Sequence, residues 1–111
     1  MSVEGPGAGL PPLTSGDRKA YTEEYMHGLD LFGRALEQCT KSQNMHQQEA
    51  FKHVMGRALQ VLNETARGLR RDDLLQQNDK IAQDFQAYGE RKDSLGERVL
   101  MEDLEQARKK L

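Results

Sequence analysis

Apolar side chains recur through residues 50–69 with alternating steps of four and three. The row consists of Phe51, Met55, Ala58, Leu62, Thr65 and Leu69. This spacing places them along one side of a helix. Val54 and Val61 form a second row beside the first. A helix that is apolar over so wide an arc needs a partner on each side, so this segment is predicted to be the central helix of a bundle.

The same four-three stepping precedes this segment and predicts a helix over residues 15–41. Its apolar positions are Tyr25, Leu29, Phe32, Leu36 and Cys39. Thr14, followed three residues later by Asp17, has the spacing of a helix start. Asn44 occupies a comparable position before the central helix, which we place at residues 45–67.

Gly68 follows the central helix, where a residue of left-handed conformation is expected, with Leu69 behind it. The stepping then resumes after Asp72-Asp73, two carboxylates that suit a helix N-terminus. Its positions are Leu74, Asn78, Ile81, Phe85 and Tyr88. A single polar residue in such a row, here Asn78, usually sets register or partner choice.

Residues 89–94 are the least helical stretch of this second half, and two interpretations fit them. One is a single long helix over residues 73–110 with an irregularity near 89–94, which we favour. The other is a break there that creates a fourth helix. The predicted fold is therefore all-α, an antiparallel three-helix bundle with helices at about 15–41, 45–67 and 73–110, with a break of the third near 89–94 as the alternative.

A third helix of that length would extend beyond its two neighbours, at about 1.5 Å per residue. Its terminal apolar row would then lack a partner within the chain, and exposed leucine rows mark interfaces. The row consists of Leu95, Val99, Leu100, Leu104 and Leu111. Our hypothesis is that these residues bind another protein or a second copy of the chain.

Composition narrows the class of protein. Residues 1–13 hold all three prolines and are predicted to be a disordered tail, while residues 14–111 form one helical domain. Charged residues make up 31 % of the chain and the net charge is −2, which argues against general nucleic-acid binding. Residues 43–71 carry five basic and two acidic side chains, whereas residues 72–88 carry one and four.

Neither a membrane span nor a charged-then-apolar leader is present, so a cytoplasmic protein is expected. Cys39 is the one cysteine, which we interpret as a reduced core residue. Adjacent carboxylates such as Glu102-Asp103 point to different sides of a helix and are interpreted as solvated faces. The histidines lack metal-ligand spacing, and we expect no metal, cofactor, membrane or small-molecule substrate.

His53 carries the one resemblance to a known family. The segment Phe51–Arg57 resembles the phosphoacceptor segment of histidine phosphotransfer domains, in which an exposed helical histidine is followed two residues later by an apolar residue, and then by Lys and Gly. Met55 fits the apolar place, although Gly56-Arg57 reverses the order of the small and the basic residue. The resemblance covers seven residues and implies a signalling carrier phosphorylated at His53.

The expected function is therefore a non-enzymatic protein–protein interaction module, an adaptor, assembly factor or secretion-type chaperone. It would act through the C-terminal row, with a groove between the first two helices as a further surface. The alternatives are the phosphocarrier and a structural subunit of a larger helical assembly. An enzyme is not expected, because so short a helical chain without clustered polar groups offers little pocket.

Overall fold

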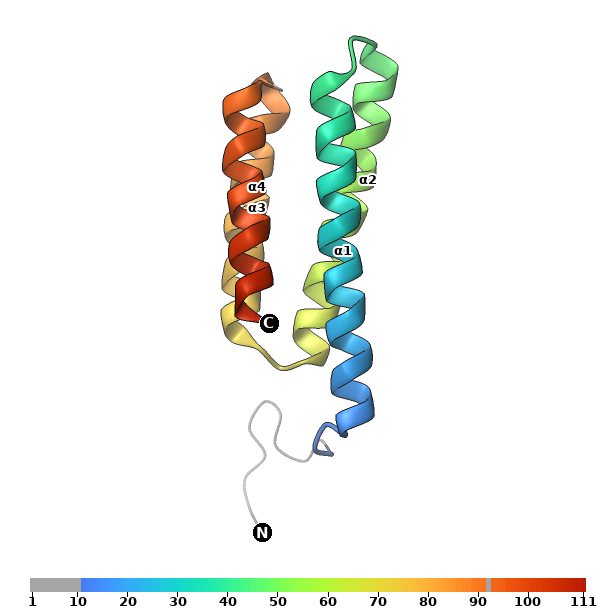
Figure 1. Ribbon diagram of the computed structural model, residues 1–111, viewed down its shortest axis with the longest axis vertical. Helices are drawn as coiled ribbons and strands as arrows, with labels where there is room; N and C mark the ends of the chain where they lie inside the picture. Colours follow the sequence, from blue (N-terminus) through green and yellow to red (C-terminus); the bar gives the residue numbers. More distant parts are fainter. Residues whose placement is uncertain (1–10, 92) are drawn as a thin grey trace.

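The computed structural model describes residues 11–91 and 93–111 and contains four helices (Figure 1). They are α1 (Ser15–Lys41), α2 (Met45–Gly68), α3 (Asp72–Arg91) and α4 (Ser94–Lys110). The all-α fold is confirmed. The first ten residues of the predicted tail lie outside the described residues.

The favoured interpretation, one long third helix, is wrong, because two helices, α3 and α4, replace it. The alternative, a break near 89–94 that creates a fourth helix, agrees with the structure. The Asp93 side chain caps α4 by accepting a hydrogen bond from the Gly96 backbone N–H at 2.8 Å. The turn folds α4 back into the bundle, where Leu100 and Ala107 become fully buried. Burying a leucine contributes about 2 kcal/mol, and the Asp93 cap satisfies one of the backbone N–H groups that a new helix start leaves without a partner.

The two predicted N-terminal caps are confirmed. Thr14 Oγ1 accepts a hydrogen bond from the Asp17 N–H at 3.0 Å, and Asn44 Oδ1 accepts one from the Gln47 N–H at 3.1 Å. Each bond satisfies a backbone N–H of the first helical turn, which has no partner within its own helix.

The end of α2 differs from the prediction. Gly68 is the last helical residue, and the left-handed residue is Arg70, with φ of 57°. A side chain at position 68 would lack room, because a Cβ there would lie 2.6 Å from the Tyr21 ring. This close contact, rather than the backbone conformation, explains why the residue is glycine. Arg71 N–H donates to the Ala66 carbonyl at 3.1 Å and closes the helix end.

The helices alternate in direction, and each packs beside its neighbours in sequence (Figure 1). The pairs α1–α2 and α3–α4 form two hairpins, which join through α2–α3 and α1–α4 contacts. Gly28 lets α1 approach α2 closely, because a Cβ there would lie 3.0 Å from Leu62. The core includes the buried side chains Tyr25, Leu29, Phe32, Leu36, Cys39, Met55, Leu62, Leu74, Ile81, Tyr88 and Leu100.

Side-chain hydrogen bonds cross the core between the hairpins. The Tyr25 hydroxyl donates to Asn78 Oδ1 at 2.6 Å, and Asn78 Nδ2 donates to Asn63 Oδ1 at 3.0 Å. The Thr40 and Tyr88 hydroxyls lie 2.7 Å apart. Asn78 is thus buried and bonded to α1 and α2, which fixes the alignment of α3 against both because every partner would be lost on sliding.

Arg71 fastens the open end of the second hairpin. Its guanidinium makes two hydrogen bonds with Asp73, at 2.7 and 2.8 Å, and one with the Lys110 carbonyl at 2.8 Å. The bond to Arg71 lowers the pKa of Asp73 to about 2. This arginine therefore holds the start of α3 beside the end of α4 and is occupied within the fold.

Candidate functional site

The predicted C-terminal row does not lie on one surface. Leu100 is fully buried and Leu104 is 4 % exposed, so the expectation that they lack partners within the chain is wrong. The reason is the turn before α4, which brings both leucines back to the core. Leu95 and Leu111 are exposed and Val99 is half-buried. Those three remain accessible to a partner.

Leu95 and Val99 border a small hollow at the closed end of the α3–α4 hairpin. Its volume is about 150 Å³, and its lining also includes Tyr88, Asp84 and Arg91. Leu95 is 60 % exposed, unusually far for a leucine in a helical bundle. This end of the molecule thus presents a short apolar edge with charged groups of both signs beside it.

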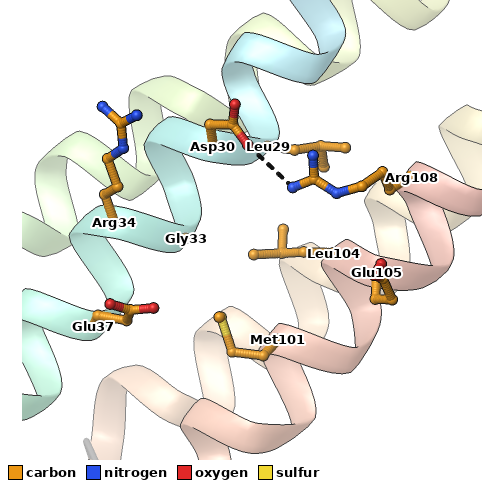
Figure 2. A pocket seen from close by; sticks show the side chains of 9 residues that line it. All are labelled: Leu29, Asp30, Gly33, Arg34, Glu37, Met101, Leu104, Glu105 and Arg108. Atoms are coloured by element: carbon orange, nitrogen blue, oxygen red, sulfur yellow. Dashed lines mark hydrogen bonds and ion pairs between the residues drawn. The ribbon is translucent and has the colours of Figure 1, made fainter.

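A larger hollow lies between α1 and α4 and is named here the α1–α4 groove (Figure 2). It has a volume of about 350 Å³ and a mixed lining: Leu29, Asp30, Gly33, Arg34, Glu37, Met101, Leu104, Glu105 and Arg108. The Arg108 guanidinium lies 3.1 Å from Asp30 Oδ1 and bridges the two helices. Apolar side chains form the floor, and charges of both signs surround it.

A second groove lies between α1 and α2 and consists of two adjoining hollows that share Gln38 and Phe51. This α1–α2 groove comprises a hollow of about 190 Å³ lined by Leu31, Arg34, Ala35, Gln38, Phe51 and Val54, and one of about 320 Å³ lined by Gln38, Lys41, Ser42, Gln47, Ala50 and Phe51. The first is lined almost wholly by apolar atoms. Leu31, Phe51 and Val54 are half-buried against the core.

A buried carboxylate lies inside the α3–α4 hairpin, contrary to the prediction that Asp103 is solvated. Asp103 is 3 % exposed, because it lies on the side of α4 that packs on α3. Lys80 Nζ lies 3.1 Å from Asp103 Oδ1 and 3.2 Å from Asp84 Oδ2. Asp103 Oδ2 has no hydrogen-bond partner among the described residues. One ammonium group thus serves two carboxyl groups.

This arrangement changes how the three groups titrate. Burial raises the pKa of Asp103 to about 7, and the neighbouring Asp84 carboxyl adds to the rise while Lys80 opposes it. The interaction with Asp103, together with Lys80, lowers the pKa of Asp84. Hydrogen bonding to Asp103 and Asp84 raises the pKa of Lys80. Burial therefore moves the pKa of Asp103 toward neutral pH, while the pKa of Asp84 moves in the opposite direction.

His53 lies on the exposed side of α2, near the middle of that helix. It borders an open hollow of about 480 Å³ whose other lining residues are Lys52, Gly56, Arg57 and Gln60. A Cβ at Gly56 would have no atom within 4 Å, so the approach to the imidazole from that side is open. Two cationic side chains and an accessible imidazole therefore share one surface.

The sequence analysis singled out His53, which is exposed in the structure, and a groove between the first two helices. It did not single out Leu31, and it placed Asp103 on a solvated face. Leu31 lies one residue before the core position Phe32, outside the four-three row. Asp103 lies one residue before Leu104, so a shift of the row by one position was the only signal for its burial. In both cases the seam of the helix is wider than a single row.

Within residues 11–91 and 93–111, no group of three or more His, Cys, Asp or Glu side chains is placed to hold a metal ion. None of the helices in these same ranges is both long and apolar enough to cross a membrane. Comparisons with protein-family models, curated proteins and solved structures give no match to this chain.

Proposed function

We propose that this chain is a non-enzymatic interaction module that binds an amphipathic helix of another protein or of a second copy. The main support for this proposal is the α1–α2 groove, where Leu31, Phe51 and Val54 are only half-buried beside the core. Grooves between paired helices commonly accept the apolar face of a third helix. An adaptor, assembly factor or chaperone role follows from such binding.

The dimensions of the groove suit a short helix. Along α1 it extends from Leu31 to Lys41, a separation of ten positions or roughly 15 Å, which corresponds to about three helical turns. Side chains at i, i+3 or i+4 and i+7 of a bound helix would then reach its apolar floor. A partner of this length buries enough leucine-sized side chains for binding without reopening the bundle.

The exposed part of the predicted C-terminal row supplies a second contact region in this proposal. Leu95, Val99 and Leu111 remain available, whereas Leu100 and Leu104 stay within the core. Leu95 and Val99 lie on α4 beside α3, on the opposite hairpin from the α1–α2 groove. A large partner is therefore able to contact both hairpins.

Methyl chemical shifts test the proposal directly. The chain, with labelled methyl groups, is titrated with synthetic amphipathic helices of leucine and mixed Glu/Lys composition. We expect shifts concentrated at Leu31, Ala35 and Val54. Leu31→Ser should weaken binding at least tenfold, while the matched surface variant Met26→Ser should leave it unchanged, because Met26 is an exposed apolar residue of α1 outside this groove. Absence of methyl shifts at every exposed apolar site would contradict the proposal.

A histidine phosphocarrier is a second candidate, supported by the exposure of His53 in a bundle of four helices and by Lys52 and Arg57 beside it. In this reaction an imidazole nitrogen attacks the phosphorus of an acyl phosphate, an N–P bond forms and the carboxylate leaves. Incubation with labelled acetyl phosphate, compared between the natural chain and His53→Gln, tests it. Equal label in both chains would exclude a role for this histidine.

A further inference from the structure

Charges are distributed unequally around α1. Its acidic side chains Asp30 and Glu37 line the α1–α4 groove (Figure 2). The only charged side chains that line the α1–α2 groove, among the described residues, are Arg34 and Lys41. Arg34 lines both grooves, and in Figure 2 its side chain extends away from Met101 and Leu104. The α1–α2 groove therefore has an apolar floor and a basic rim.

The two cations are free to act on a bound partner. Arg34 and Lys41 are both exposed, and neither forms an ion pair with another residue of the described chain. They are seven residues apart, which places them on one side of α1 at a separation of roughly 10 Å, or two turns. The hollow beside His53 on α2 is lined by two further cations, Lys52, which is paired with Glu49 at 3.2 Å, and Arg57.

We propose that the occupant of the α1–α2 groove is a helix whose apolar row is flanked by acidic side chains. This inference rests on the proposed function and specifies the chemistry of the partner. Carboxylates about two turns apart would meet Arg34 and Lys41, whereas a basic helix would bring like charges together over the same floor. Such rim charges mainly set specificity and association rate.

The α1–α4 groove provides an internal comparison. It is lined by three carboxylates and two guanidinium groups, and its Arg108 is already paired with Asp30 at 3.1 Å. Since its carboxylates outnumber its guanidinium groups, this groove offers no preference for an acidic helix. A preference for acidic helices therefore distinguishes binding at the α1–α2 groove from binding at the α1–α4 groove.

Two synthetic helices of about four turns, with the same leucine row and either Glu or Lys at the flanking positions, test the proposal. Fluorescence anisotropy measures affinity and methyl shifts at Leu31 and Val54 locate the peptide. The Glu peptide should bind at least tenfold more tightly at low salt, and the ratio should shrink as salt screens the rim. The double variant Arg34→Glu/Lys41→Glu should reverse the preference.

Arg98→Glu is the matched control, because Arg98 is an exposed cation on α4 that lines neither groove. It should leave the ratio of affinities unchanged. Equal binding of both peptides at Leu31 and Val54 would overturn the acidic partner and leave the proposed function standing. Binding of neither peptide, or binding confined to the α1–α4 groove, would overturn both the acidic partner and the proposed function at the α1–α2 groove.

Discussion

The two hairpins share one architecture but are joined internally in different ways. The α1–α2 interface is closed by apolar contacts, with Gly28 allowing Leu62 to approach α1. The α3–α4 interface contains Asp103, the one charged residue that is buried among those the structure describes. Apolar burial is insensitive to pH, whereas a buried carboxyl group is not. The stability of the first hairpin is therefore expected to vary little with pH, whereas that of the second is expected to depend on the protonation of Asp103.

The largest effect on stability is expected from removing one core leucine from each hairpin. Leu62→Ala and Leu100→Ala each delete a fully buried side chain, and each should lower the free energy of unfolding by about 3 kcal/mol. Because the Tyr25–Asn78 and Thr40–Tyr88 bonds cross between hairpins, we expect a single unfolding transition in both variants. Urea unfolding followed by circular dichroism measures it.

Hydrogen exchange resolves whether the hairpins behave as one unit. If the two are energetically separate, Leu100→Ala will accelerate exchange of α3 and α4 amides while α1 and α2 keep their protection. That pattern, or two transitions in urea, would contradict cooperative unfolding. Leu95→Ala is the matched control, since this exposed leucine should change stability by less than about 0.5 kcal/mol.

An effect of intermediate size is expected from pH. The pKa of Asp103 is about 7 in the folded chain and near 3.9 when unfolded, so the folded form holds the proton more tightly. The stabilising contribution is complete below about pH 4 and is lost as pH rises through 7. We expect a fall of about 2 kcal/mol over this range, below the ceiling of roughly 4 kcal/mol that the full pKa difference sets.

Asp103→Asn should flatten this pH dependence, as measured by urea unfolding between pH 4 and pH 8. The matched control is Asp30→Asn, which removes an exposed carboxylate paired with Arg108 and should leave the slope unchanged. The lowered pKa of Asp84 acts in the opposite sense, and its contribution is lost only as pH falls toward its own, lower pKa. An unchanged slope in Asp103→Asn would show that the carboxyl group is hydrated.

The smallest effect is expected where the two hairpins join. Arg70 has φ of 57°, a conformation that disfavours side chains with a Cβ by about 1 kcal/mol. Arg70→Gly removes this strain but also the exposed hydrogen bond from Arg70 Nη2 to the Pro11 carbonyl, worth about 0.5 kcal/mol. Thermal unfolding should therefore show a net gain of about 0.5 kcal/mol.

Arg57→Gly provides the contrast, since Arg57 is an exposed residue in the interior of α2. There a glycine should lower stability by about 1 kcal/mol, because it weakens the helix without relieving strain. The same direction of change in both variants would contradict the left-handed conformation of Arg70.

Local rules were enough to predict the first hairpin. The caps at Thr14 and Asn44, with uninterrupted four-three rows, define α1 and α2 to within one residue. Gly68 misled because a glycine after a helix suggests a left-handed residue, whereas here the Tyr21 ring, 47 positions earlier in the chain, requires the missing Cβ. Contacts this distant in sequence leave no local pattern.

The second hairpin depended on a balance that local patterns do not decide. Residues 89–94 are nearly as compatible with a helix as with a turn, and the burial of Leu100 and Leu104 decides between them. The burial of these leucines depends on the packing of α1 against α4, which no local sequence pattern records. The candidate site was predictable to the same extent: the pairing of α1 with α2 indicates a groove, but its basic rim depends on which sides of α1 carry Arg34 and Glu37.

The burial of Cys39 has a consequence for following the molecule's motions. Its thiol is fully buried where α1 meets the start of α2, with Sγ 3.5 Å from the Gln48 carbonyl, and it is the only cysteine in the sequence. A thiol reagent therefore modifies only those molecules that have transiently opened. The rate at which the Cys39 thiol is labelled therefore reports local opening of the first hairpin, and the measurement requires no engineered cysteine.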